Sequence, residues 1–290
     1  MQKWWRQHKT QLKFLKSDQS QLIAKVAAHT YSTANVQQLE AVALSFLWAI
    51  SFDDDVLERA TSEEDLLKYK GEFLKYFDSK NLDEALSFSI YCYMILQVFI
   101  KFEPYMSESQ KIRFRRELEL YLDGAAREVR IVKTSHELNY EEFLEVRLLT
   151  SSYALYELYG EICNQIDMSD YFSDELFRKN KCSITAMVSY LNDIYSYNKE
   201  LKTDFKGNLV YQTQKYFNCT SKEAMNISIK IFQKEKEIFD KTSTELIEKY
   251  SSNESMKKYV LAMRNWALGN HLTYKYDIRY RISNDEALNL

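Results

Sequence analysis

The scarcity of proline and glycine is the feature that most constrains how this chain can fold. Its 290 residues include one proline, Pro104, and five glycines, whereas average usage would give about 14 and about 20. β-Sheets need many tight turns, and tight turns depend on these two residues for backbone angles that others avoid. The sequence therefore predicts an all-α protein. Because no proline-rich or glycine-rich linker divides it, we expect one domain spanning residues 1–290.

Composition narrows the class of protein further. Hydrophobic residues make up 46% and aromatic residues 14% of the chain, which is ample for a large core. The formal net charge of −3 offers no basic surface for nucleic acid. No run reaches the roughly 18 apolar residues of a membrane span. Four scattered cysteines without a CxxC spacing favour free thiols in a reducing compartment, so we expect a cytoplasmic protein.

Helix signals recur along the chain. An apolar stretch beginning near Val36 follows a loop that ends in a capping residue. Ser62 with Asp65 resembles a capping box, and Asn139 can cap a helix that begins with two glutamates, which suit the positive end of the helix dipole. These signals and the apolar patterning predict helices at about 20–28, 36–52, 86–102, 107–133, 173–201, 221–250 and 255–281.

The first motif of chemical interest is Asp53-Asp54-Asp55-Val56-Leu57-Glu58, at the polar end of the apolar helix expected over 36–52. Adjacent carboxylates beside an apolar cavity cost free energy unless cations neutralise them, and oxygen ligands of this kind suit Mg²⁺. A solvated helix end is the alternative interpretation of this motif alone. The register is also open, because either Asp53-Asp54 or Asp54-Asp55 can lead the motif that ends at Glu58. Asp54 belongs to both registers.

The second motif lies in the helix expected over 173–201. Asn192, Ser196 and Glu200 follow an i, i+4, i+8 spacing, so they project from one helix face. This stripe combines an amide oxygen, a hydroxyl and a carboxylate, a set that a structural helix seldom needs, although a hydrated polar stripe remains the alternative. Lys199 adjoins Glu200 and could point toward an anion. Two such clusters facing each other would hold several divalent cations, as a bound diphosphate would need.

With these two motifs the chain resembles the class I terpene synthases of microbial type, found in bacteria, fungi and social amoebae. That family carries a DDxxD or DDxxxD/E motif and an NDxx(S/T)xxxE motif on a facing helix. Asn192, Asp193, Ser196 and Glu200 match the second motif, and Lys199 stands at the position before the glutamate that is often basic.

Two further segments resemble the diphosphate-binding parts of the family. Residues 139–150 are similar to the helix that carries a diphosphate-sensing arginine, which would be Arg147. The segment from Gly269 resembles the family's terminal segment, with Arg279 and Tyr280 as the diphosphate-binding pair. The chain departs from the family pattern at Thr273, where tryptophan is usual. It also has Thr150 and Ser151 at the positions after the arginine that couple it to the substrate in the family. The backbone carbonyl of Ser151 could still make this contact, because it does not depend on the side chain.

The resemblance implies a single-domain helical bundle around a central apolar active-site cavity. It implies Mg²⁺-dependent ionisation of a linear isoprenyl diphosphate, with farnesyl diphosphate as the default, and cyclisation of the carbocation to a terpene hydrocarbon or alcohol. Three Mg²⁺ ions are expected with diphosphate bound, and helical homodimers are frequent in the family. The implied metal ligands are Asp54, Asp55, Glu58, Asn192, Ser196 and Glu200, and the implied diphosphate-binding residues are Arg147, Lys199, Arg279 and Tyr280.

Two alternatives remain at this point. A chain-elongating isoprenyl diphosphate synthase shares the helical fold, but that activity normally relies on two DDxxD motifs. A non-catalytic helical relative would be favoured by loss of the arginine, tyrosine or glutamate positions, and all of these are present.

Aromatic residues near the motifs are candidates for the cavity wall, because ring faces stabilise cationic intermediates. The candidates are Phe46, Trp48, Phe52, Tyr195 and Trp266. Core packing is the alternative for each of them, and the one that we favour for the wall is Trp266.

Overall fold

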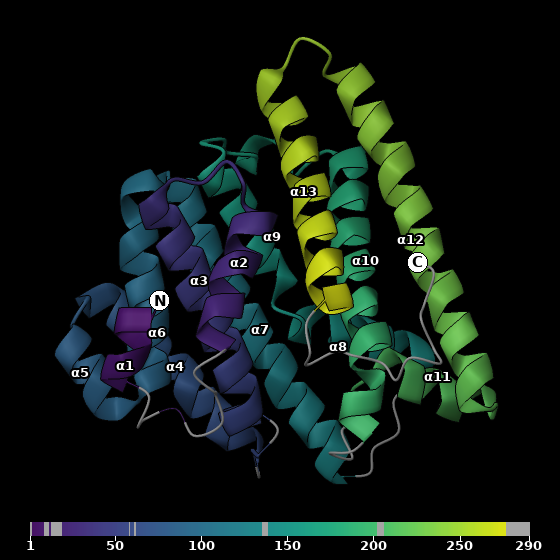
Figure 1. Ribbon diagram of the computed structural model, residues 1–290, viewed down its shortest axis with the longest axis horizontal. Helices are drawn as coiled ribbons and strands as arrows, with labels where there is room; N and C mark the ends of the chain where they lie inside the picture. The colour runs from purple at the N-terminus through teal and green to yellow at the C-terminus, as the bar shows by residue number, and fades with distance from the viewer. Residues whose placement is uncertain are drawn as a thin grey trace.

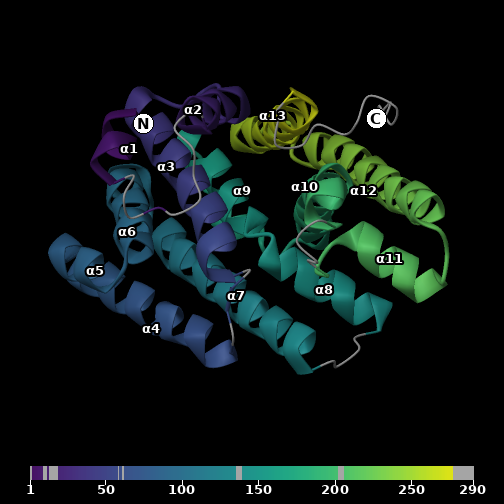
Figure 2. The same ribbon diagram turned by 60° about the horizontal axis from the view of Figure 1, so that its bottom comes forward.

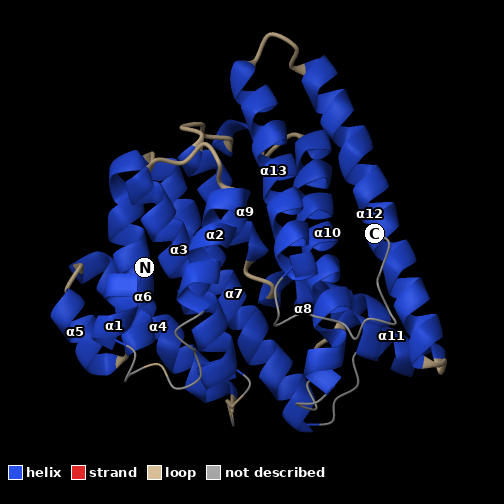
Figure 3. Ribbon diagram, in the orientation of Figure 1, coloured by secondary structure: helices blue, strands red, loops and turns tan. Residues whose placement is uncertain are grey.

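The computed structural model describes residues 2–8, 12, 19–57, 59–60, 62–134, 139–201 and 206–276. Every regular element in these ranges is a helix and none is a strand (Figure 3). This confirms the all-α fold that the lack of turn residues predicts. Three of the residues singled out above, Glu58, Arg279 and Tyr280, lie outside the described residues.

The first half of the chain forms α1 (Gln2–His8), α2 (Gln19–Thr30), α3 (Val36–Phe52), the π-helix η1 (Asp53–Leu57), α4 (Glu63–Ser79), α5 (Leu82–Phe88), α6 (Ile90–Phe102), the 3₁₀ turn η2 (Glu103–Tyr105) and α7 (Glu108–Thr134). The second half forms α8 (Tyr140–Thr150), α9 (Tyr153–Cys163), the 3₁₀ turn η3 (Ser169–Tyr171), α10 (Glu175–Glu200), α11 (Leu209–Phe217), α12 (Ser221–Lys249) and α13 (Glu254–Tyr276).

Side-chain caps fix where several of these helices begin. Ser62 and Asp65 form the expected capping box at the start of α4, and Asn139 forms one with Glu142 at the start of α8. Each box satisfies backbone N–H groups that have no partner within the helix. The helix expected near Ser173 instead begins after Asp174, whose side chain accepts a hydrogen bond from the backbone of Leu176 at 2.9 Å.

The apolar stretch 86–102 is broken, which the sequence does not reveal. Ser89 lies in the extended region at φ −162°, where its N–H ends α5 and its hydroxyl accepts a hydrogen bond from the backbone N–H of Tyr91 at 3.1 Å. Serine can cap helices in this way because its side chain competes with the backbone for hydrogen bonds. The break separates α6, which packs on α3, from the short helix α5.

The helices enclose a central region rather than forming layers. On one side α3 packs between α2 and α6, and α4 packs on α7. On the other side α10 lies between α12 and α13, and α11 joins α12 to α8. α2 packs against α13 as well as α3, while α9 contacts α7, α10 and α13, so these helices link the two sides (Figures 1 and 2).

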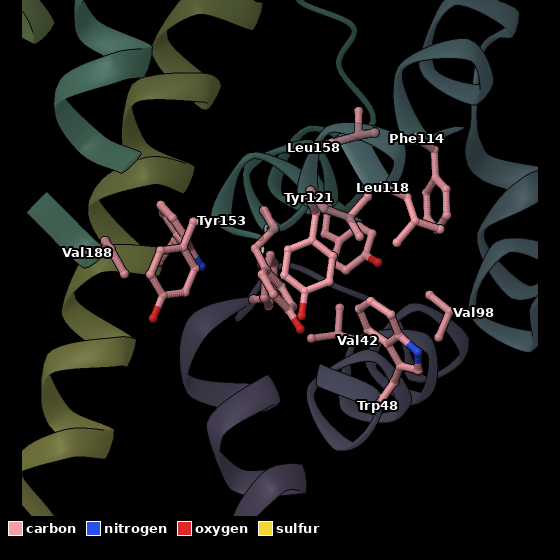
Figure 4. Close-up of a cluster of buried hydrophobic side chains, with 14 of the residues drawn as sticks. Val42, Trp48, Val98, Phe114, Leu118, Tyr121, Tyr153, Leu158 and Val188 are labelled. Carbon is pink, nitrogen blue, oxygen red and sulfur yellow. Dashed lines mark hydrogen bonds between the residues drawn. The ribbon is translucent and has the colours of Figure 1, made fainter. Parts of the chain in front are cut away.

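Aromatic side chains form much of the core between α3 and α7. Trp48 is fully buried, and its ring centroid lies 5.4 Å from that of Phe52 and 5.8 Å from that of Tyr121. Figure 4 shows Trp48 and Tyr121 together, with Phe114 and Leu118 farther along α7. Such close packing holds α7 in a fixed position against α3. No helix among the described residues has the length and apolar character needed to cross a membrane.

Candidate active site

A cavity of about 190 Å³ lies where the two sides of the bundle meet. α2, α3, η1, α7, α8, α9, α10 and α13 all contribute to its wall, together with the connection between α8 and α9. The lining residues are Ile23, Val26, Phe46, Ala49, Ile50, Asp53, Leu57, Tyr121, Glu128, Arg147, Thr150, Ser151, Ser152, Tyr153, Tyr156, Asn192, Ser196, Lys199, Glu200, Asn270, Thr273 and Tyr274.

The cavity wall has two chemically different parts. α2 and α3 supply an apolar part that includes Ile23, Val26 and Ile50. η1, α7, α8 and α10 supply a charged part that includes Arg147 and Lys199. A concave apolar site with a few convergent polar groups is the usual form of a small-molecule site. This one suits a molecule with an apolar body and a charged end.

The three aspartates of the first motif point in different directions. Asp53 lines the cavity, whereas Asp54 Oδ1 lies 3.6 Å from Lys199 Nζ on α10. Asp55 instead accepts a hydrogen bond from the hydroxyl of Tyr91 on α6. The residues belong to a π-helix, a type of helix that is rare overall but is often found at functional sites. Asp53 and Asp54 are therefore the two aspartates directed at the cavity and at α10, and the Asp53-Asp54 register is the one that contains both.

The second motif lines the opposite wall of the cavity. Asn192, Ser196 and Glu200 are all lining residues on α10, as their spacing along one helix face predicts. Burial raises the pKa of Glu200, and the nearby Asp193 raises it further. Both causes penalise negative charge at this position, and a bound cation would relieve that penalty.

Arg147 is held in the cavity wall by Asp193. Its Nε lies 2.9 Å from Asp193 Oδ2 and its Nη2 lies 2.5 Å from Asp193 Oδ1, a two-pronged arrangement that fixes the plane of the guanidinium. The two side chains are 12% and 1% exposed. Burial alone would lower the pKa of Arg147, but the carboxylate of Asp193 outweighs it and the pKa is raised. Arg147 is therefore a permanent cation facing the cavity.

The helical path is interrupted between α8 and α9, about one helical turn after Arg147. Ser152 has a left-handed backbone with φ 55°, which costs free energy for a residue other than glycine. The Ser151 hydroxyl donates to the carbonyl of Leu148 at 2.8 Å, and the Ser152 hydroxyl donates to the carbonyl of Ser151 at 2.6 Å. Such strained positions concentrate at functional sites, and here the break brings Thr150, Ser151 and Ser152 to the cavity wall.

α7 approaches this break closely because Gly124 has no side chain. A Cβ atom there would lie 2.7 Å from the Cβ of Leu149 and 3.3 Å from its backbone carbon. We expect Gly124→Ala to destabilise the fold by about 1–3 kcal/mol, since backbone must move to accept the methyl group. Gly71→Ala on α4 is the matched control, because nothing lies within 4 Å of that position and it should stabilise by about 0.5–1 kcal/mol. Urea unfolding measures both; equal effects of the two substitutions would contradict the close approach.

Glu128 is an acidic cavity residue that the sequence does not single out. It lies on α7 and lines the cavity with Arg147 and Glu200. Burial raises its pKa to about 8, and the positive charge of Arg147 offsets only part of that effect. The negative charges of Asp53, Asp193 and Glu200 add to the rise. The cavity thus carries an excess of acidic groups in the metal-free protein.

This excess of acid predicts a pH-dependent stability. The folded protein binds the Glu128 proton up to about pH 8, whereas the unfolded chain releases it near pH 4.5, so stability falls as the pH rises between these values. Glu128→Gln removes this titration. In metal-free protein we expect the Tm of Glu128→Gln to match that of the wild type near pH 4.5 and to exceed it increasingly up to pH 9. Parallel Tm profiles would contradict this account of Glu128.

Aromatic rings line a further part of the wall. Phe46 stacks on Tyr156 with ring centroids 4.8 Å apart, and the hydroxyls of Tyr153 and Tyr274 lie 2.8 Å apart. All four line the cavity, whereas Trp266, the aromatic favoured from sequence, packs behind it against Tyr153 with ring centroids 5.6 Å apart. Periodicity alone does not separate core rings from cavity rings, since both face the interior.

Comparison with known proteins agrees with this geometry. Residues 45–237 match the family described as terpene synthase family 2, C-terminal metal binding. Terpene synthase 4 of Physarum polycephalum is 26% identical over 271 residues, which cover 90% of this chain and 79% of that protein. The chain therefore belongs to the terpene synthase family. It is a class I terpene synthase, a metal-binding enzyme of terpene cyclisation.

Solved structures share the fold. The 2-methylisoborneol synthase of Streptomyces coelicolor A3(2), in complex with Mg²⁺ and geranyl-S-thiolodiphosphate, superposes with a TM-score of 0.83 at 16% identity, covering 98% of this chain and 91% of that one. Germacradien-4-ol synthase from Streptomyces citricolor superposes with a TM-score of 0.75 at 16% identity, covering 94% of this chain and 90% of that one. The helical bundle is thus that of the class I terpene synthases.

Proposed function

We propose that the chain forms one catalytic domain that ionises a linear isoprenyl diphosphate, most simply farnesyl diphosphate, with Mg²⁺ and cyclises the resulting cation. The observation that carries this proposal is the two-part cavity. Acidic and amide oxygens from η1 and α10 meet Arg147 at one part of the cavity, and much of the remaining wall is apolar or aromatic. A diphosphate joined to a hydrocarbon chain has the matching two-part chemistry.

The oxygen donors of this chain fit Mg²⁺. Among the described residues, no three or more histidine, cysteine, aspartate and glutamate side chains gather closely enough to hold a metal by themselves. The donors instead divide between η1 and α10, which suits ions that take part of their coordination from substrate phosphates. We assign Asp54 to one set, with Asp53 added from the structure, and Asn192, Ser196 and Glu200 to the other. Asp55 and Glu58 remain proposed members of the first set.

Bound Mg²⁺ would neutralise the charge that develops on the departing diphosphate, with three ions expected. The chain's own cations would add to this effect. Arg147 donates hydrogen bonds to Asp193 from Nε and Nη2. Its Nη1 lies 3.5 Å from the hydroxyl of Thr150, beside the cavity. Lys199 pairs with Asp54 and would exchange this partner for a diphosphate oxygen. Arg279 and Tyr280 are proposed to join them. Donors aimed at developing charge act mainly in the transition state.

The remaining wall would guide the hydrocarbon cation after the C–O bond breaks. The rings of Phe46, Tyr121 and Tyr156 line the cavity, and aromatic rings can stabilise positive charge without reacting with it. Ser151 lines the same cavity between α8 and α9, and we propose that its carbonyl offers a negative dipole end to the cation. Closure of the apolar wall would exclude water until ring closure ends in proton loss or water capture.

The state of the cysteines suggests the cellular compartment in which the enzyme works. Cys92 and Cys163 are buried, Cys182 is exposed, and all four are free thiols. Exposed free thiols persist where glutathione and thioredoxin keep them reduced. We therefore propose that the enzyme works in the cytoplasm.

The test is turnover of geranyl, farnesyl and geranylgeranyl diphosphate with Mg²⁺, followed by gas chromatography with mass spectrometry. We expect a cyclic terpene hydrocarbon or alcohol, with farnesyl diphosphate giving the largest yield. A larger yield from another chain length would correct the substrate, and no terpene from any of the three would overturn the proposed function.

A further inference from the structure

Asn208 is a buried polar residue that the motifs leave without a role. It follows the second motif in the sequence and stands directly before α11. Its side chain is only 1% exposed, and it does not line the cavity. A buried amide must satisfy both its donor and its acceptor groups, so its partners show what it holds in place.

The two ends of the Asn208 amide make different kinds of contact. Its Oδ1 accepts a hydrogen bond from the backbone N–H of Val210 at 2.8 Å and so caps α11. Its Nδ2 donates to the carbonyl of Asp193 at 2.9 Å and to Glu200 Oε2 at 2.8 Å, and lies 3.4 Å from Ser196 Oγ. The cap needs only the oxygen, whereas the nitrogen reaches three members of the second motif.

The neighbouring backbone extends these contacts to Arg147. The N–H of Leu209 donates to Asp193 Oδ2 at 2.9 Å, and the same carboxylate holds the guanidinium of Arg147. The start of α11 therefore contacts the proposed metal ligands on α10 directly and the cavity arginine through one intermediate. These contacts come from a segment outside the motif.

We propose that Asn208 is a positioning residue that fixes the orientation of Glu200 and Ser196 for cation binding. The inference rests on the proposed function, since it concerns the metal set assigned to α10. The terminal torsion of a glutamate is broad, and Asp193 repels the Glu200 carboxylate. A donor on Oε2 restrains the carboxylate plane before the ion arrives. Partners of this kind behind metal ligands typically contribute 10- to 100-fold in affinity.

Asn208→Ser separates the two roles of the residue. Serine is also a good N-cap, so the start of α11 should persist, but serine lacks the Nδ2 that reaches Glu200. We expect the Mg²⁺ concentration for half-maximal terpene formation to rise about 10-fold or more, with kcat at saturating Mg²⁺ within about threefold of the wild type. Asn208→Ala, which loses the cap as well, should show the same Mg²⁺ shift and a lower Tm.

Thr220→Ala is the matched control. Thr220 caps α12 through a capping box with Glu223 and lies outside the cavity wall. It should lower the Tm as a lost cap does and leave the Mg²⁺ requirement unchanged. If Asn208 had only a structural role, both of its variants would keep the wild-type Mg²⁺ requirement. Only Asn208→Ala, which loses the cap, would then have a lower Tm.

A turnover-independent measurement separates failure of this inference from failure of the proposed function. The rise in Tm caused by Mg²⁺ with inorganic diphosphate is measured for each variant. We expect stabilisation of the wild type and of Thr220→Ala, and a need for about 10-fold more Mg²⁺ in Asn208→Ser. Wild-type Mg²⁺ dependence in Asn208→Ser overturns this inference alone. A wild type that gains no stability from Mg²⁺ and diphosphate and forms no terpene overturns both.

Discussion

Replacing Arg147 by alanine is expected to lower terpene formation by about 10²- to 10³-fold or more and the free energy of unfolding by about 3–5 kcal/mol. The activity falls because a preorganised cation is removed from the site where diphosphate charge develops. The stability falls because Asp193, only 1% exposed, is left as a buried charge without its partner. The measurements are kcat/KM at a temperature where the variant is folded and unfolding in urea.

The chain contains a closely matched control for this substitution. Arg113 donates two hydrogen bonds to Glu161, from Nη1 to Oε2 at 2.7 Å and from Nη2 to Oε1 at 2.6 Å. The side chain of Arg113 is 13% exposed and that of Glu161 is 1% exposed. The Arg147–Asp193 pair has exposures of 12% and 1%, but only Arg147 lines the cavity. Arg113→Ala should cost similar stability and retain kcat/KM within a few-fold. Equal losses of activity in the two variants would mean that Arg147 acts only through folding.

Asn192→Ala is expected to reduce activity by about 10²-fold or more at moderate Mg²⁺, with little change in stability. Asn192 lines the cavity on α10, and alanine removes its amide oxygen from the proposed metal set while favouring the helix. Raising Mg²⁺ should recover part of the activity. The measurement is terpene formation across a Mg²⁺ titration.

Asn198→Ala provides the control for that titration. Asn198 lies on the same helix and is also half-buried, but it is not part of the cavity wall. It should keep the wild-type Mg²⁺ requirement. Near wild-type activity of Asn192→Ala at every Mg²⁺ concentration would show that the second motif does not bind the metal.

Local features of the sequence predict the fold well. The near absence of glycine and proline excludes sheets, and capping residues such as Ser62 and Asn139 mark helix starts because they act within one turn. The stripe of Asn192, Ser196 and Glu200 is also local, since regular helical spacing is enough to align it. The break at Ser89 is harder to predict, because it depends on one hydroxyl competing with the helix backbone.

Features that depend on irregular backbone or on tertiary contacts could not be predicted. The first motif lies in a π-helix, so the directions of Asp53, Asp54 and Asp55 depend on a backbone form that the sequence does not reveal. Asn208 reaches partners eight to fifteen residues away, and only the packing of the start of α11 against α10 brings them together. Glu128 resembles any charged residue of an amphipathic helix until the fold places it in the cavity wall with Arg147 and Glu200.

The most direct test of the central claim is a balance of diphosphate released and terpene formed from farnesyl diphosphate. The reaction is run with Mg²⁺, with EDTA, and with Mg²⁺ plus isopentenyl diphosphate, which would be the co-substrate of a chain-elongating enzyme. We expect equal amounts of diphosphate and cyclic terpene with Mg²⁺, neither product with EDTA, and no longer-chain diphosphate in the third reaction. Elongated products, or no Mg²⁺-dependent terpene at all, would contradict a cyclase built on these two motifs.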